Sequence, residues 1–168
     1  MQKESVQTIL QALNAASVRY LVAGGLAVVA HGYLRFTADV DLILDLEENN
    51  VRRALAAFTG LGYRPRPPVP IESFADPRAR EKWQQEKGLV AFSLYSPAHL
   101  GTEVDLFVKC PLDFERAFAS ALRLDIAPGV SAAFVNYQDL IALKRQANRP
   151  QDLLDLEQLR LIHERKEE

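Results

Sequence analysis

The sequence predicts an α/β protein in which short β-strands alternate with amphipathic helices, and two kinds of observation support this. Short apolar runs bounded by glycine or charged residues, such as Tyr20–Ala23 and Asp39–Leu44, are typical of buried strands. Elsewhere apolar residues recur at helical spacing, as in residues 3–16. The chain has 168 residues, 48% of them hydrophobic, which is enough for one domain with a sizeable core. We expect a single domain over residues 1–168.

Charge and cysteine content narrow the class of protein. The formal net charge of −2 argues against a protein that coats nucleic acid by charge alone. The single cysteine, Cys110, cannot form an intramolecular disulfide, which favours a reducing compartment. The N-terminal residues lack the apolar core of a signal peptide, and the uncharged stretch 21–34 is too short for a membrane helix. We therefore expect a cytoplasmic protein.

The first part of the chain is predicted as helix, strand, helix. After the helix at 3–16 comes the strand Tyr20–Ala23, which Gly24-Gly25 breaks. A helix can then start at Leu26, and Gly32 suits its end because glycine adopts the left-handed cap conformation without penalty.

The strand Asp39–Leu44 is followed by another predicted helix. Asp45 is expected to cap it, with Glu48 supporting the first turn. The helix should end near Thr59, because Gly60 follows.

An insertion is expected between residues 64 and 87. Four prolines within 64–70 favour an extended, polyproline-like arm, and the polar residues 71–87 indicate a short helix. A substrate-specific insertion and a solvated surface loop are both open interpretations of this segment.

The second half is predicted to contain two strand pairs. Residues 89–95 and 103–108 fit a hairpin, and a helix over 113–120 follows. Residues 122–126 and 131–135 then flank the turn at Pro128-Gly129 as short strands.

Two helices are predicted to close the chain. Asn136 can cap the first, which runs through Ala147, and Pro150 suits the start of the second. The apolar face of the last helix is predicted to comprise Leu153, Leu156, Leu159 and Ile162.

Three acids carry the sharpest functional hypothesis. Asp39 and Asp41 are two residues apart on one strand, so both carboxylates point to the same face. Such acids repel each other, and a hard divalent cation with oxygen ligands is the usual reason for the pairing. A third acid, Asp105, lies between apolar neighbours on a later strand, where Glu103 competes for its role. The alternative is that some of these are surface acids on an edge strand.

The pattern of these residues resembles the signature of the DNA polymerase β superfamily of nucleotidyltransferases. Gly24-Gly25, thirteen intervening residues and then Asp39-Val40-Asp41-Leu42 match it, as does the later Val104-Asp105-Leu106. Arg35 and Thr37 fit the form Arg-x-Thr-x-Asp-x-Asp of many members. The resemblance is greatest to small bacterial members, including AbiEii-type toxins and antibiotic nucleotidyltransferases. It covers residues 18–108 well and the C-terminal helices, 136–164, more weakly.

The resemblance implies a nucleotidyltransferase fold, in which a small mixed β-sheet is flanked by helices. It also implies transfer of a nucleoside monophosphate from an NTP, with two Mg²⁺ ions, or Mn²⁺, held by three carboxylates. The implied metal and catalytic residues are Asp39, Asp41 and Asp105, and the implied nucleotide ligands are Gly24, Gly25, Arg35, Thr37 and Lys144.

Structural alternatives remain for the implied nucleotide ligands. The glycine pair could serve only as a tight turn, and Arg35 could pair with a surface acid. Lys144 could be a helix-surface lysine beside Asp152 and Asp155.

The acceptor is expected to be an RNA end or a partner protein, in a toxin–antitoxin or related system with a cognate partner. Few residues follow Asp105 to build a drug pocket, whereas the insertion is basic. Its basic residues are Arg64, Arg66, Arg78, Arg80 and Lys82. An aminoglycoside- or lincosamide-type antibiotic nucleotidyltransferase and a non-catalytic regulator that binds a nucleotide or a partner are the alternatives.

Overall fold

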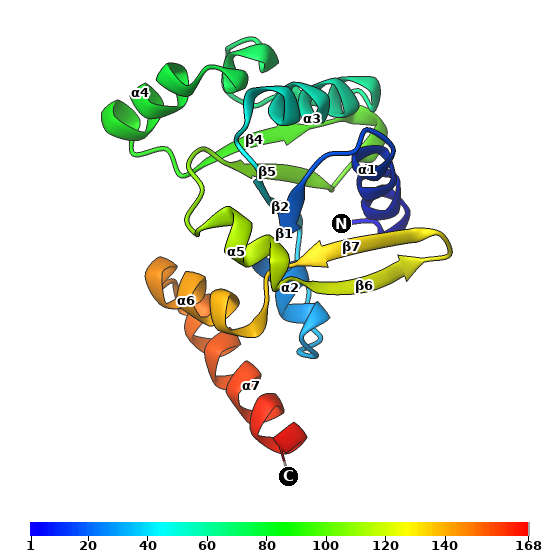
Figure 1. Ribbon diagram of the computed structural model, residues 1–168, viewed down its shortest axis with the longest axis vertical. Helices are drawn as coiled ribbons and strands as arrows, with labels where there is room; N and C mark the ends of the chain where they lie inside the picture. The colour runs from blue at the N-terminus through cyan, green and yellow to red at the C-terminus, as the bar shows by residue number, and fades with distance from the viewer. Residues whose placement is uncertain (168) are drawn as a thin grey trace.

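A seven-stranded mixed sheet forms the centre of the protein, and seven α-helices surround it in the computed structural model, which describes residues 1–167 (Figure 1). The strands lie in the order β3-β4-β5-β2-β1-β7-β6. They are β1 Tyr20–Val22, β2 Asp39–Leu44, β3 Arg64–Pro65, β4 Ala91–Tyr95, β5 Glu103–Phe107, β6 Leu122–Ala127 and β7 Val130–Phe134. The pairs β2–β5 and β1–β7 are parallel, and the others are antiparallel. The predicted α/β class with a mixed sheet is confirmed.

The helices confirm most of the predicted elements. They are α1 Lys3–Ala15, α2 Gly24–Ala30, α3 Glu48–Gly60, α4 Pro77–Lys87, α5 Phe114–Ala119, α6 Tyr137–Ala147 and α7 Pro150–Glu167. Short 3₁₀ turns occupy Ile71–Ala75 and Pro97–His99. Asn136 caps α6 as predicted, because its Oδ1 accepts a hydrogen bond from the backbone N–H of Asp139 at 2.8 Å. Within residues 1–167, no helix is both long and apolar enough to span a membrane.

The two faces of β2 and β5 differ in burial. Val40, Leu42, Val104 and Leu106 are fully buried on one face and belong to the same hydrophobic core as the apolar faces of α1 and α3. On the other face, the three predicted acids are only partly buried, whereas Ile43, near the end of β2, is fully buried. The core therefore fixes the register of strands whose opposite face is polar.

The cap of α3 is Glu47, and the prediction of Asp45 was wrong. The Glu47 carboxylate accepts hydrogen bonds from the backbone N–H groups of Asn49 and Asn50, at 3.0 and 2.9 Å. Asp45 instead accepts hydrogen bonds from the backbone of Glu47 and from Arg19. The helix consequently begins at Glu48.

Residues 64–70 do not form a free polyproline arm. Arg64–Pro65 is the edge strand β3, paired with β4, and the backbone N–H of Arg66 donates to the carbonyl of Ser93 at 2.9 Å. Proline is tolerated there because an edge strand leaves one row of N–H positions unpaired. The next helix, α4, is also anchored, since Trp83 stacks on Phe92 with ring centroids 5.2 Å apart.

The predicted apolar face of α7 is wrong at its first position. Leu153 is 55% exposed, while Asp152 and Asp155 are fully buried and Leu159 is 1% exposed. The helix therefore turns an acidic stripe, rather than a leucine stripe, toward α6 over its first two turns. Residue 168, at the end of the charged C-terminal segment, lies outside the described residues.

Candidate functional site

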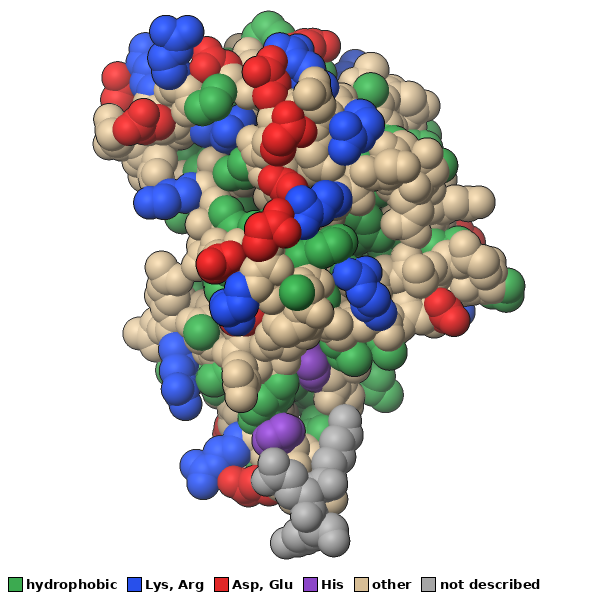
Figure 2. Space-filling model, in the orientation of Figure 1, with side chains coloured by type: hydrophobic (Ala, Val, Ile, Leu, Met, Phe, Trp, Pro, Cys, Tyr) green, Lys and Arg blue, Asp and Glu red, His purple; other side chains and the backbone are tan. Residues whose placement is uncertain are grey.

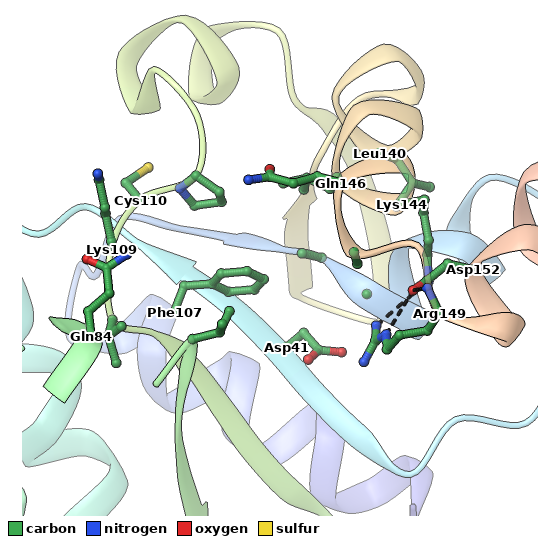
Figure 3. Close-up of a pocket in the computed structure, with 17 residues that line it drawn as sticks. Asp41, Gln84, Phe107, Lys109, Cys110, Leu140, Lys144, Gln146, Arg149 and Asp152 are labelled. Atoms are coloured by element: carbon green, nitrogen blue, oxygen red, sulfur yellow. Dashed lines mark hydrogen bonds and ion pairs between the residues drawn. The ribbon is translucent and has the colours of Figure 1, made fainter. Parts of the chain in front are cut away.

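A cavity of about 600 Å³ lies between the polar face of the sheet and the helices α6 and α7 (Figure 3). Its volume is within the range of small-molecule sites. Residues from distant parts of the chain line it, among them Gly24, Asp41, Phe107, Lys144, Arg149 and Asp152. The cavity thus brings predicted metal-site and nucleotide-site residues together.

The three predicted acids share the polar face of the sheet. Asp41 is the register partner of Asp105 across the parallel pair β2–β5, and Asp39 is the partner of Glu103. Neighbouring strands lie about 4.8 Å apart, so Asp41 and Asp105 are direct neighbours. Asp41 also lines the cavity, and the Oγ of Ser93 donates a 2.5 Å hydrogen bond to Asp105.

Burial and nearby negative charges raise the proton affinity of Asp39 and Asp41. Burial and the negative charges of Asp105 and Asp39 together raise the pKa of Asp41 to about 6, against the opposing positive charges of Arg149 and Lys144. Burial, Asp105 and Glu103 likewise raise the pKa of Asp39. The acids are therefore electrostatically coupled, as expected for carboxylates that share a site.

The donor set fits a hard cation by its chemistry, because it offers only oxygen ligands. In the described part of the chain, however, no three Asp, Glu, His or Cys side chains are gathered as in a preformed metal centre. Asp105 is instead turned into its hydrogen bond with Ser93. A cation held by Asp39, Asp41 and Asp105 would require their side chains to reorient.

The glycine pair is needed for close packing against the predicted site. Gly24 has φ +58°, and a Cβ there would lie 1.9 Å from Oδ2 of Asp41. A Cβ on Gly25 would lie 2.3 Å from Oγ1 of Thr37. The structure thus gives both glycines a steric role, and their contact with phosphate stays a prediction.

Gly24→Ala is expected to destabilise the protein by roughly 1–3 kcal/mol, because the new methyl group meets Asp41 in a backbone conformation that favours glycine. Urea denaturation would measure the loss. Gly60→Ala is the matched control, because a Cβ there meets nothing within 4 Å. Equal stability of Gly24→Ala and the wild type would contradict the close packing.

A cluster of charged residues, partly buried, joins α6 to α7 at one wall of the cavity. The Nζ of Lys144, whose side chain is 4% exposed, lies 2.7 Å from both Asp152 and Asp155. Arg35 forks onto Asp155 through Nε at 2.6 Å and Nη2 at 2.8 Å. Arg149 contacts Asp152 through Nε at 2.8 Å. We call these five residues the ion cluster.

The ion cluster changes the interpretation of two predicted phosphate ligands. Arg35 does pair with an acid, as the alternative held, but that acid, Asp155, is buried. Lys144 does lie beside Asp152 and Asp155, although it is itself buried rather than on the helix surface. Both cations are thus engaged by carboxylates.

Arg149 was missed as a site residue by the sequence reasoning. Its side chain is 71% exposed and lines the cavity, where its charge acts on Asp41. The signal was present in Arg149-Pro150-Gln151-Asp152, where a helix start places an arginine beside an acid. Burial opposes ionisation of Asp152, but hydrogen bonds from Arg149 and Lys144 outweigh it and lower the pKa to about 2.

No known family model matches this chain, and neither does any curated protein sequence. A proposal for its function therefore rests on its own motif pattern, acids, cations and cavity.

Proposed function

We propose that this protein is a metal-dependent nucleotidyltransferase, which moves a nucleoside monophosphate from an NTP to an RNA end or a partner protein. One observation carries the proposal: Asp41 and Asp105 are register partners on the face that carries Asp39, and Asp41 lines a cavity shared with Lys144 and Arg149. The resemblance of the glycine–aspartate pattern to the DNA polymerase β superfamily supports the same reaction.

Asp39, Asp41 and Asp105 would hold the divalent cations, for which Mg²⁺ is the proposed ion. When bound, such ions neutralise phosphate charge and activate the attacking oxygen. Asp105 is the proposed acceptor of the proton from the attacking hydroxyl, after its carboxylate turns from the hydrogen bond with Ser93 toward the site. Gly24 leaves space for Asp41 at the edge of the cavity.

The ion cluster would supply positive charge to the triphosphate. Its three cations exceed its two carboxylates, so it carries one net positive charge beside Asp41. Arg149 is the cation best placed for direct contact, because its exposed guanidinium can fork onto phosphate oxygens. Lys144 and Arg35 would act mainly by charge and by holding α7 in place.

Fewer basic side chains are available to bind a macromolecular acceptor than the sequence indicated. Arg80 is 6% exposed and donates to the carbonyl of Phe74, while Arg66 pairs with Glu103. Figure 2 shows acidic side chains interspersed with basic ones over the region of α3 and α4. Arg64 and Arg78 are the exposed arginines of the insertion that remain for an acceptor.

Transfer to a macromolecule is expected to require Mg²⁺ and Asp41. The protein would be incubated with α-labelled NTPs, total RNA and cell lysate, and the labelled fraction identified. Asp41→Asn should abolish labelling, and Arg64→Ser with Arg78→Ser should reduce it several-fold without changing NTP binding. Arg160→Ser is the control, since Arg160 is 77% exposed on α7.

Other outcomes would favour the alternatives. Efficient labelling of an aminoglycoside, with no labelled macromolecule, would support an antibiotic nucleotidyltransferase. Nucleotide binding without transfer to any acceptor would support a non-catalytic regulator.

A further inference from the structure

The cavity has an apolar end that the proposed phosphate and metal residues do not use. Figure 3 shows Phe107 projecting into the cavity between Asp41 and the Cys110 side, with Gln146 reaching in from α6. Val90, Leu140 and Leu143 also line the cavity. A charged end and an end built around the Phe107 ring, which Lys109 and Gln84 also line, therefore face the same space.

Phe107 is placed to contact a ligand. It lies on the same sheet face as Asp105, two residues and thus about 6.6 Å further along β5. Among the described residues, Phe107 forms no ring–ring contact with another aromatic side chain, whereas Phe92 stacks on Trp83 and meets Phe74 at a tilted angle. Its side chain packs partly against the core, and the part of the ring that stays exposed toward the cavity can serve as an apolar contact surface.

Val90 gives a second, independent indication. It is 67% exposed although it is apolar, and it lines the cavity beside Phe107. On α6, Leu143 also lines the cavity, whereas Leu140 lies on the Lys144 side of it (Figure 3). An apolar ring and an exposed valine beside an open space suit a planar, weakly polar group, and amides at the rim can satisfy its polar edge.

We propose that the Phe107 end of the cavity binds the nucleobase of the NTP, with Phe107 as the stacking platform, Val90 as an apolar contact and Gln146 as the residue that reads the base edge. This inference rests on the proposed nucleotidyltransferase function. It divides the cavity into two parts, with the triphosphate toward Arg149 and the base toward Phe107. It also identifies three specificity residues that the motif pattern does not include.

Inorganic tripolyphosphate separates the two parts experimentally, because it has the charge of the triphosphate and no base. The affinities of tripolyphosphate and of ATP, GTP, CTP and UTP would be measured by calorimetry with Mg²⁺ present. Stacking of one base is worth about 5- to 150-fold in affinity. The wild type is therefore expected to bind at least one NTP tighter than tripolyphosphate by a factor in this range.

Phe107→Ala should remove the tighter binding of NTPs relative to tripolyphosphate, and it should leave the affinity for tripolyphosphate unchanged. Phe107→Tyr should restore the tighter binding of NTPs. Val90→Ser should weaken NTP binding in the same selective way. Because Val90 is exposed, this substitution should not disturb folding. Leu100→Ser, at a leucine 71% exposed outside the cavity, is the control. Gln146→Leu should change the order of affinities among the four NTPs.

The outcomes distinguish this inference from the proposed function. If the wild type binds tripolyphosphate and NTPs equally, or if Phe107→Ala and Val90→Ser both leave the NTP advantage intact, the base site is overturned while the phosphate site stands. If neither tripolyphosphate nor any NTP binds with Mg²⁺, the proposed function and the base site both fall.

Discussion

Lys144→Met is expected to lower the free energy of unfolding by about 3–5 kcal/mol, the usual cost of removing one partner from a buried ion pair. The Nζ of Lys144 is 2.7 Å from both Asp152 and Asp155, which are buried, so its loss leaves two neighbouring carboxylates without their shared cation. Methionine keeps most of the side-chain volume, so the effect isolates the charge. Urea denaturation at pH 7 would measure it.

The matched control is Lys109→Met, because Lys109 is exposed in the same cavity and its loss should change stability by less than about 0.5 kcal/mol. Asp155→Asn added to Lys144→Met should recover part of the loss, because one unpaired charge is removed. A loss below about 1 kcal/mol for Lys144→Met would show that Arg35 and Arg149 alone satisfy the two acids.

Asp41→Asn is expected to stabilise the metal-free protein by up to about 3 kcal/mol at pH 7 and by almost nothing at pH 4. Burial and the charges of Asp105 and Asp39 raise the pKa of Asp41 from 3.8 to about 6, so the folded state binds its proton more tightly than the unfolded chain does. The stability that the protonated Asp41 gives the wild type is fully present below about pH 4 and is lost as pH rises through about 6. Each pK unit corresponds to about 1.4 kcal/mol.

The unfolding free energies of the wild type and Asp41→Asn would be measured from pH 4 to 8. Their difference should grow with pH, which tests the direction of the effect. Asp152 has the opposite effect, because its pKa is lowered to about 2 and the stability it gives is lost as pH falls from 4 toward 2. This range lies below the pH range in which Asp41 titrates, so the two effects can be separated. Asp125→Asn, at an exposed acid of β6, is the control and should show no such trend.

Magnesium should reverse the advantage of Asp41→Asn. A cation that binds only the folded state raises the melting temperature of the wild type by mass action, and the variant should lose most of that rise. Equal stabilisation of both proteins by Mg²⁺ would place the cation away from Asp41.

The sequence predicted the elements that local patterns control. The alternation of Asp39, Val40, Asp41 and Leu42 located β2 and the face of each side chain, and Asn136 located the start of α6. Pairings between distant residues could not be predicted. Arg35 and Asp155 are 120 positions apart, and no local pattern indicates that this arginine pairs with that buried acid.

The same limit explains the errors in α7 and in the insertion. Leucine spacing predicted an apolar face that included Leu153, but burying Asp152 and Asp155 against Lys144 and Arg35 turned Leu153 to the surface. The basic composition of the insertion likewise suggested that Arg80 is exposed, but Arg80 is buried and its guanidinium lies over the ring of Phe74. Tertiary contacts outweighed local pattern in both cases.

The parallel pair β1–β7 has a consequence for the order of folding. Val22 pairs with Phe134, and the backbone N–H of Val135 donates to the carbonyl of Val22 at 3.0 Å. Closing a chain segment of this length is entropically costly and slow, so local hairpins such as β4–β5 should form earlier. The helix α6 begins directly after β7, and the Lys144 side of the cavity is carried by that helix. A partly synthesised or partly folded chain can hold the acids of β2 and β5 in register and still have no enclosed cavity, so ligand binding reports on completion of the fold.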